Sequence, residues 1–365
     1  MPTHADYSRG PRIPFISDQE RFMISIKSLL SRLVLVLLGS GACMASAQDA
    51  PVGVVLNFGP NLYTYGGGIC MQPEGLAIDP EGNLYADSSD QIGGIGHICV
   101  ISPKGAVIDV IDVAPGPTGV IGMVGEYWRD GFLYVLDQAD NNPPDGRVLK
   151  INPHTHSITT FATGFNFPNC IVSDRDGNFF VTDSFLGEIF RIDGETHAVT
   201  VWNASPVLLS TNPDLPVGAN DLAFDRDEKW LYVSNAGNRT VHRIAVNPDG
   251  SAGAVELFAD GPTIDRKYKL PSPTALYFAD GIQFDVKGNL YVMSNVTAEV
   301  EVYAAPAQTL VARYSGVGAN AMDFNASPVF KGRTLYMSDF SNNDNGVGSK
   351  ISVMTAPYPG LALPR

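Results

Sequence analysis

Side-chain oxygens recur at a fixed offset in several short hydrophobic segments of this sequence. Asn169 stands five positions before Asp174 in "NCIVSD". The same offset separates four other pairs: Glu74 and Asp79, Asn220 and Asp225, Asp280 and Asp285, and Asn320 and Asn325. Carboxylate and amide oxygens are the ligands that hard cations such as Ca²⁺ prefer. If the strands that begin with these residues meet around one axis, the sequence predicts a site for such a cation.

The segments belong to a longer repeat whose second strands are easily aligned. They are "GNLYADSS" (82–89), "GFLYVLDQ" (131–138), "GNFFVTDS" (177–184), "KWLYVSNA" (229–236), "GNLYVMSN" (288–295) and "GRTLYMSD" (332–339). Most copies continue into a third and a fourth β-rich run, and helical periodicity is almost absent. Four antiparallel strands repeated six times indicate an all-β fold, a six-bladed β-propeller.

The ends of the repeat predict how the ring closes. The last copy supplies only three strands and ends in "SKISVMTA" (349–356), whereas "VGVVLNF" (52–58) stands alone near the other end. We expect the segment 52–58 to complete the sixth blade, because an unpaired sheet edge invites aggregation. The first strand of each blade then lines a central tunnel. The expected strand heads are Glu74, Met123, Asn169, Asn220, Asp280 and Asn320.

Residues 1–47 are predicted to be a cleaved secretory signal, and residues 48–365 a single propeller domain. The signal has a basic start, an apolar core and a small-residue end: Lys27 and Arg32, Leu33–Leu38, and Ala45-Ser46-Ala47. Lipid attachment at Cys43 is disfavoured, because Ser40 stands where a branched aliphatic residue is expected. The predicted location is therefore secreted or periplasmic.

Charge and cysteine content narrow the class of partner. The chain has a formal net charge of −14, and removing the signal makes it more negative. Such a surface argues against nucleic acid and anionic membranes and fits a monomer that acts on a small molecule. Export permits one disulfide, most simply Cys70–Cys99, which leaves Cys170 as a packed thiol.

The chain resembles the calcium-dependent six-bladed propellers of the regucalcin and gluconolactonase family and, more remotely, paraoxonases and squid-type diisopropyl fluorophosphatase. The resemblance covers about residues 52–356 and is carried by four motifs: "PEGLAIDPEGNLY", "PNCIVSDRDGNFFVTDS", "NDLAFDRDEKWLYVSN" and "DGIQFDVKGNLYV". It implies a catalytic Ca²⁺ held by one residue from each motif, namely Glu74, Asn169, Asn220 and Asp280. It also implies that Met123 of blade two stays outside the coordination sphere.

The resemblance further implies a hydrolase of a lactone or related ester, in which Ca²⁺ polarises the carbonyl and Asp280 is the general base or nucleophile. Sugar-lactone hydrolases of this family tend to place a basic residue two before the blade-three asparagine, where this chain has Phe167. With Tyr127 nearby, this favours a moderately apolar substrate. The residues expected to contact substrate are Phe167, Met123, Tyr127 and Asn320.

Three alternatives stay open from the sequence. The strand-head oxygens can cap turns and bind tunnel water without any ion. The propeller can also be a non-catalytic binding module with a structural ion, since one fold hosts many functions. A lyase or isomerase that uses the same metal is a third alternative. Motifs for a Ser-His-Asp triad, a zinc site or a phosphate loop are absent from the sequence.

Overall fold

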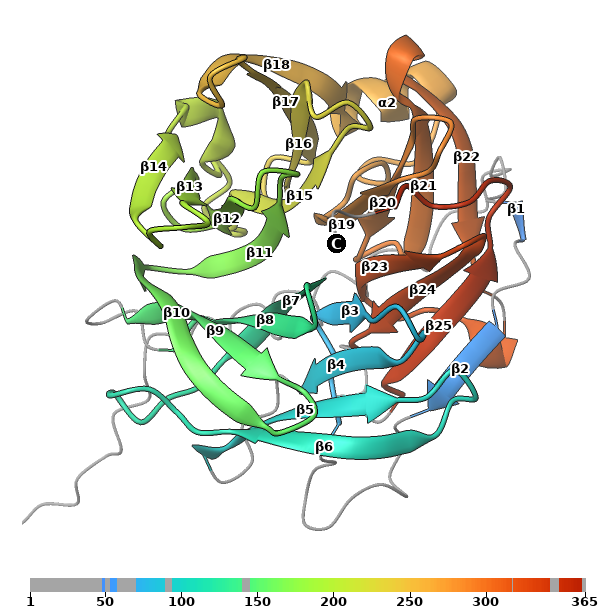
Figure 1. Ribbon diagram of the computed structural model, residues 1–365. Coiled ribbons are helices and arrows are strands. Elements are labelled where there is room, and N and C mark those ends of the chain that lie inside the picture. The colour runs from blue at the N-terminus through green and yellow to red at the C-terminus, as the bar shows by residue number, and fades with distance from the viewer. Residues whose placement is uncertain are drawn as a thin grey trace, which may run out of the picture.

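Six antiparallel sheets surround a central tunnel like the blades of a propeller (Figure 1). The structure is a computed structural model that describes residues 48–49, 53–57, 70–88, 94–139, 145–316, 318–341 and 348–362. The predicted signal, residues 1–47, lies outside the described residues. The predicted fold class is confirmed: the protein is a six-bladed propeller with four antiparallel strands per blade.

Blades 1 to 3 follow one another along the chain, each running from the tunnel outward. Blade 1 contains β3 (Leu76–Ile78), β4 (Leu84–Ser88), β5 (Gly96–Ile101) and β6 (Val107–Val113). Blade 2 contains β7 (Met123–Arg129), β8 (Phe132–Asp137), β9 (Gly146–Asn152) and β10 (Ser157–Phe165). Blade 3 contains β11 (Pro168–Ser173), β12 (Phe179–Asp183), β13 (Glu188–Ile192) and β14 (Val199–Asn203).

Blades 4 to 6 complete the circle in the same order. Blade 4 contains β15 (Ala219–Phe224), β16 (Trp230–Asn235), β17 (Thr240–Val246) and β18 (Ala252–Asp260). Blade 5 contains β19 (Ala279–Phe284), β20 (Asn289–Ser294), β21 (Glu299–Ala304) and β22 (Thr309–Ser315). Blade 6 contains β23 (Asn325–Lys331), β24 (Thr334–Asp339), β25 (Lys350–Thr355) and β2 (Gly53–Asn57).

The ring closes as the sequence predicts. The strand β2 pairs antiparallel with β25, so the segment near the N-terminus supplies the outermost strand of blade 6. The first strands contact one another in a closed circle, in the order β3, β7, β11, β15, β19, β23 and back to β3. A short strand, β1 (Gln48–Asp49), adds to the outer edge of blade 5 in parallel with β22.

The turn aspartates of the repeat hold the first hairpin of four blades. Each accepts backbone N–H groups from the residues that begin the second strand: the Oδ1 of Asp79 from Asn83 at 2.7 Å, that of Asp174 from Asn178 at 2.8 Å, that of Asp225 from Lys229 at 2.8 Å and that of Asp285 from Asn289 at 2.9 Å. These side chains mimic a backbone turn, which is why Asp is favoured there. The second half of the five-residue offset is therefore structural.

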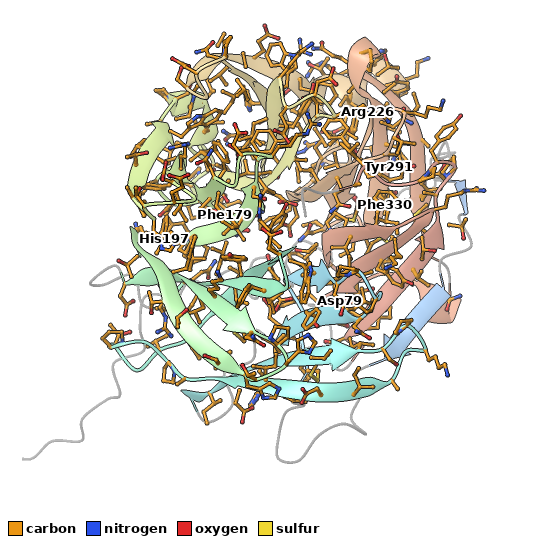
Figure 2. All side chains as sticks on the ribbon, viewed as in Figure 1. Asp79, Phe179, His197, Arg226, Tyr291 and Phe330 are labelled. Carbon is orange, nitrogen blue, oxygen red and sulfur yellow. A yellow bond between two sulfur atoms is a disulfide. The ribbon has the colours of Figure 1, made fainter. Side chains whose placement is uncertain are left out.

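Apolar side chains fill the space between neighbouring blades. Six clusters of buried residues lie at the six blade-to-blade contacts. Tyr291 of blade 5 and Phe330 of blade 6, for example, face one another edge to face with ring centroids 5.3 Å apart (Figure 2). Large aromatic rings of this kind bury much apolar area and hold the sheets at a fixed angle.

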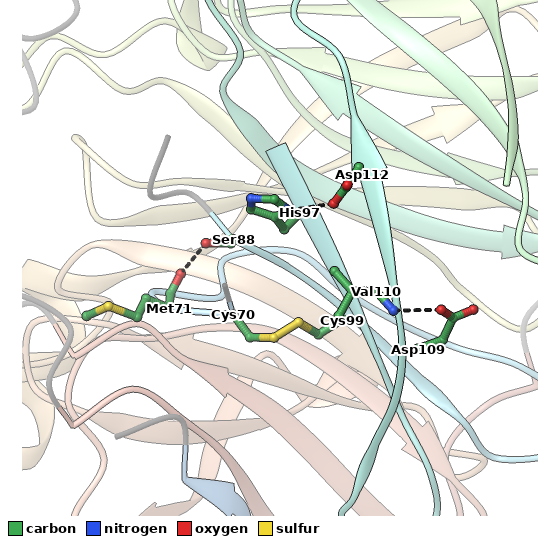
Figure 3. Close-up of a disulfide and its surroundings, with 8 residues drawn as sticks. All are labelled: Cys70, Met71, Ser88, His97, Cys99, Asp109, Val110 and Asp112. Atoms are coloured by element: carbon green, nitrogen blue, oxygen red, sulfur yellow. Dashed lines mark hydrogen bonds and ion pairs between the residues drawn. A yellow bond between two sulfur atoms is a disulfide. The ribbon is translucent and has the colours of Figure 1, made fainter. Parts of the chain in front are cut away.

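The single disulfide lies where the ring closes. Cys70 and Cys99 are bonded, as the sequence predicts, and their Cα atoms are 5.9 Å apart (Figure 3). Both sulfurs belong to the cluster between blades 1 and 6, together with Ile351 of β25. Nearby, the hydroxyl of Ser88 donates to the carbonyl of Met71 at 3.0 Å (Figure 3). The cross-link thus secures the chain four residues before Glu74.

One helix was not predicted. The segment between blades 4 and 5 forms α2 (Gly261–Tyr268), whose N-terminus is capped by Asp260 accepting the N–H of Thr263 at 2.9 Å. A helix of two turns stabilised by its cap gives too short a hydrophobic pattern to be recognised in a β-rich sequence. Within the described part of the chain, no helix has the length and apolar character needed to cross a membrane.

Candidate metal-binding and active site

Four of the predicted ligands stand at equivalent positions in their blades. The residue after each head fixes the register, because its N–H donates to a hydroxyl of the second strand: Cys170 to Thr182 at 2.9 Å, Asp221 to Ser234 at 2.9 Å and Ser327 to Ser338 at 2.8 Å. In blades 2 and 5 that residue is glycine, since a Cβ there would lie 2.3 Å from the carbonyl oxygen of Asn169 or 2.2 Å from that of Ala326. The heads by this register are Glu74, Val124, Asn169, Asn220, Asp280 and Ala326.

The structure corrects two expected heads. Asn320 is exposed in a 3₁₀ turn (Gly318–Asn320) five residues before β23, so the prediction that it heads a tunnel strand is wrong. The offset misleads here because Asn325 begins the strand rather than capping a turn. Met123 does begin β7, but its buried side chain packs between blades 1 and 2.

The two acidic heads lie close enough for the charge of Asp280 to act on Glu74. Burial raises the pKa of Glu74 well above its usual range, and the Asp280 carboxylate is the strongest of the charges that raise it further. Burial also raises the pKa of Asp280 to about 7, although amide donors from Asn295 and Asn220 partly offset this. The Nδ2 of Asn295 donates to Asp280 Oδ2 at 2.6 Å. These interactions place the side chains of Asn220 and Glu74 close to that of Asp280.

Several oxygens of this ring have no hydrogen-bond partner. Glu74 Oε2 and Asn220 Oδ1 are buried and unpartnered, and Asn220 is only 1% exposed. Buried polar oxygens without a partner are costly, which suits a bound cation. The donor set of two carboxylates and two amides fits a hard divalent ion such as Ca²⁺. Among the described residues, no group of three or more His, Cys, Asp or Glu side chains is arranged to hold a metal ion.

A cavity of about 440 Å³ extends from the ring along the tunnel. Asn169 and Asp280 line one end of it, and residues that follow the heads in all six blades line its walls. Leu361 and Ala362 of the C-terminal segment lie at the opposite end, where the N–H of Leu361 donates to the carbonyl of Phe284 at 2.8 Å. The ring of oxygens therefore forms one end of a largely apolar tunnel.

Three carboxylates beside the ring, those of Asp87, Glu126 and Asp221, were missed by the sequence analysis. Asp87 is buried and accepts the N–H groups of Glu74 at 2.9 Å and Gly75 at 3.0 Å, and burial raises its pKa to about 8. Burial raises the pKa of Glu126 well above its usual range, and both its carboxylate oxygens are unpartnered. Asp87 is the last but one residue of a second strand and could have been found from the motif "LYADS", but nothing in the sequence marks Glu126.

Asp221 and Cys170 form the other pair. The thiol of Cys170 contacts the Asp221 carboxylate, and the N–H of Ile282 donates to Asp221 Oδ2 at 2.6 Å. Burial raises the pKa of Asp221 to about 6 and that of the Cys170 thiol well above its usual range. Cys170 is a free thiol that is partly buried and lines the cavity, so its packing is less complete than predicted.

The two aromatic residues predicted to contact substrate lie in different places. Phe167 is buried two residues before Asn169 and stacks on Phe185, with centroids 4.0 Å apart. Tyr127 packs between blades 2 and 3, and its hydroxyl accepts from Ser173 at 3.1 Å. Tyr127 lines the cavity. Phe167, which precedes the head residue Asn169, lies on the opposite side of the ring.

Comparison with known proteins agrees with this architecture. No family model matches the chain. The sequence is 25% identical over 233 residues to the lactonase drp35 of Staphylococcus epidermidis and 26% identical over 228 residues to that of Staphylococcus haemolyticus. Each alignment covers 61% of this chain and 63% of the relative, so the chain matches slightly less than two thirds of the length of these relatives.

Solved structures show the same fold. A gluconolactonase from Xanthomonas campestris superposes with a TM-score of 0.58 at 16% identity, covering 86% of this chain and 91% of that one. A luciferin-regenerating enzyme superposes with a TM-score of 0.57 at 16% identity, covering 80% of this chain and 95% of that one. Together with the geometry above, these similarities fit a six-bladed propeller of the regucalcin and gluconolactonase-like family.

Proposed function

We propose that this protein is an exported, Ca²⁺-dependent hydrolase of a lactone or related ester. The observation that carries the proposal is the set of strand-head oxygens from Glu74, Asn169, Asn220 and Asp280, of which Glu74 Oε2 and Asn220 Oδ1 are buried and unpartnered and Asn169 and Asp280 line the tunnel cavity. Similarity to staphylococcal lactonases supports the reaction class. The Cys70–Cys99 disulfide supports export, because such bonds persist in oxidising compartments.

Each ring residue has a distinct role in this proposal. Glu74 and Asp280 supply the negative charge that holds the cation, and Asn169 and Asn220 supply neutral oxygens. When bound, Ca²⁺ supplies Lewis-acid stabilisation of the negative charge that develops on the carbonyl oxygen. Asn295 fixes the Asp280 carboxylate through its 2.6 Å hydrogen bond, so that the other edge of that carboxylate can face a water molecule.

Asp280 is the proposed general base. Its carboxylate accepts a proton from water as the water oxygen adds to the carbonyl carbon. The proton then passes to the alkoxide oxygen when the acyl C–O bond of the lactone breaks. Burial keeps the pKa of this carboxylate at about 7 in the ion-free protein, which is higher than that of an exposed aspartate. Burial of the ring in the tunnel limits contact with bulk water and strengthens each electrostatic contact.

A panel of lactones and aryl esters assayed with Ca²⁺ and then with excess chelator tests the proposal. We expect turnover that chelator abolishes and that Asp280→Asn lowers at least about 10³-fold. The exposed Asp214→Asn variant, which lies outside the ring, is the matched control and should keep full activity. A folded protein that binds the ion but turns over nothing would contradict the hydrolase proposal and favour a binding module with a structural ion.

A further inference from the structure

Five phenylalanines surround the ring on the side opposite the cavity. Phe167, Phe278 and Phe324 occupy the same place in blades 3, 5 and 6, two residues before Asn169, Asp280 and Ala326. The cavity is lined by residues that follow the head residues along each strand. These three phenylalanines precede the head residues and therefore lie on the other side of the ring. Phe185 lies two residues after the second strand of blade 3 and stacks on Phe167. Phe340 directly follows the second strand of blade 6 and packs against Phe324. We call these five residues the aromatic rim.

The rim is a contiguous apolar surface in which Phe185 and Phe324 are partly exposed, whereas Phe167, Phe278 and Phe340 are buried. Phe167 stacks on Phe185 with an interplanar angle of 17°, while Phe324 lies 5.4 Å from Phe278 and 5.9 Å from Phe340 between ring centroids. Leu215 and Val217 join the two groups, since Phe185, Phe278 and Phe324 all pack in one cluster with them. The apolar surface therefore extends over four consecutive blades, 3 to 6, three of which carry proposed ligands.

The backbone at the rim is strained. Phe278 and Phe324 have φ angles of 58° and 64°, a left-handed conformation that bulky side chains rarely adopt. The same position of blade 1 is also left-handed, at Gln72, so the turn itself belongs to the fold. Glycine or asparagine would fit this turn with less strain. Strain of this kind clusters at functional sites, which points to a use for the rings themselves.

Charged groups beside the rim are already engaged. The carboxylate of Asp183 accepts the N–H of Phe167 at 3.0 Å. Arg239 donates to Asp265 at 2.6 Å and to the carbonyl of Ala275 at 2.7 Å, and its guanidinium lies 5.7 Å from the Tyr277 ring centroid. A polyhydroxylated sugar lactone requires donors and acceptors around it, and phenylalanine rings offer neither. An alkyl or aryl substituent, by contrast, gains free energy in proportion to the area it buries there.

We infer that the aromatic rim binds the hydrophobic substituent of the substrate, so that the enzyme selects lactones or esters with an alkyl chain of several carbons over sugar lactones. This inference rests on the proposed hydrolase function. The carbonyl lies at the ion ring, and the chain lies against Phe278, Phe324 and Phe340.

The test is a series of γ-lactones with alkyl chains of increasing length, compared with glucono-δ-lactone. We expect kcat/KM to rise about two- to fourfold per added methylene until the rim is covered, and the sugar lactone to be the poorest substrate. Phe324→Ser should flatten this slope, with losses that grow with chain length. Its head residue, Ala326, is not a proposed ligand. Phe258→Leu, a substitution in the core between blades 4 and 5, is the control and should keep the slope.

A second series separates failure of this inference from failure of the hydrolase proposal. Alkyl γ-lactams of the same lengths resist hydrolysis and can be scored by the rise in the thermal unfolding temperature, which requires no turnover and no variant. Lactones turned over with a flat or reversed dependence on chain length would overturn the rim inference and leave the hydrolase standing. Graded lactam protection without turnover of any lactone would support the rim and overturn the hydrolase. Neither turnover nor graded protection would overturn both.

Discussion

The head positions and the turn positions of the repeat carry the same kinds of side chain but are treated differently by the fold. Asp285 lies five positions after Asp280, and Asp225 lies five positions after Asn220. The turn carboxylates receive backbone N–H groups in four blades, whereas the ring keeps Glu74 Oε2 and Asn220 Oδ1 unpartnered. A satisfied polar group stabilises a turn, but a buried, unsatisfied one destabilises the free protein. The difference indicates which half of the repeat serves structure and which half serves a ligand.

The strongest way to break the comparison is to neutralise a ring carboxylate. Asp280→Asn should lower kcat/KM at least about 10³-fold while raising the free energy of unfolding of the ion-free protein at pH 8 by about 1–3 kcal/mol, because a buried charge is removed. Lactone assays and denaturant titrations measure the two effects. Loss of both stability and activity would mean that Asp280 is structural, like the turn aspartates.

Opening the disulfide tests how firmly blade 1 holds Glu74 in the ring. A double Cys70→Ala, Cys99→Ala variant should lose about 3–4 kcal/mol of unfolding free energy, as expected for a cross-link between residues 29 apart in sequence. Ca²⁺ affinity should also fall, because the cross-link anchors the chain next to Glu74. The exposed Val201→Ala on the outer strand of blade 3 is the control and should change neither the Ca²⁺ affinity nor the unfolding free energy by as much. Unchanged stability of the double variant would contradict this role.

A third class of carboxylate sharpens the comparison, since Glu301 is buried and hydrogen-bonded but belongs to no ring. Its Oε1 accepts the N–H of Leu276 at 3.0 Å, and its other oxygen receives the hydroxyl of Tyr303. Glu299 and Arg313 are the other charged groups nearby. Burial raises the pKa of Glu301 to about 7.

The folded state therefore retains a proton that the unfolded chain loses as the pH rises above about 4.5. The contribution of Glu301 to stability should be fully present below that pH and should be lost as the pH rises to about 7, at a cost of up to about 3 kcal/mol. Denaturant titrations at pH 5 and pH 8 measure it, and Glu301→Gln should remove this part of the slope. The exposed Glu195→Gln is the control. An identical slope in Glu301→Gln and wild type would contradict the prediction.

The smallest expected effect is at a turn. Asp285→Ala should lower the free energy of unfolding by about 1–2 kcal/mol, because the N–H groups of Lys287 and Asn289 lose their acceptor. The value of kcat/KM for a lactone should stay within about twofold of wild type. If activity fell by more than the loss of stability explains, the turn aspartate would also serve the active site, which would contradict the division between structural turn residues and ligand-binding head residues.

Much of the architecture could be predicted from the sequence because the repeat is long and regular. The closure of blade 6 by residues 52–58 follows from counting strands, and the disulfide follows from the predicted export and from the two cysteines at blade 1. The heads in blades 3, 4 and 5 follow from the turn aspartates, which fix the hairpin that comes after them. In blades 2 and 6 that signal fails, since Arg129 and Lys331 stand where the other four blades have a turn aspartate.

The missing parts of the site depend on contacts that no local pattern encodes. A glycine follows the head residue in blades 1, 2 and 5, because the next blade approaches closely there. This glycine identifies Val124 rather than Met123 as the head residue of blade 2. The pairing of Cys170 with Asp221 joins blades 3 and 4 across 51 residues. The aromatic rim joins segments of four blades, and the left-handed backbone at Phe278 and Phe324 has no signature in phenylalanine itself.

Calorimetric titration of chelator-treated protein with Ca²⁺ tests the central claim most directly. Wild type should bind one ion per chain, Glu74→Gln and Asp280→Asn should each weaken binding at least about tenfold, and the turn variant Asp285→Asn should bind like wild type. Equal binding by wild type and both ring variants, or no binding by wild type, would show that these oxygens do not enclose a cation.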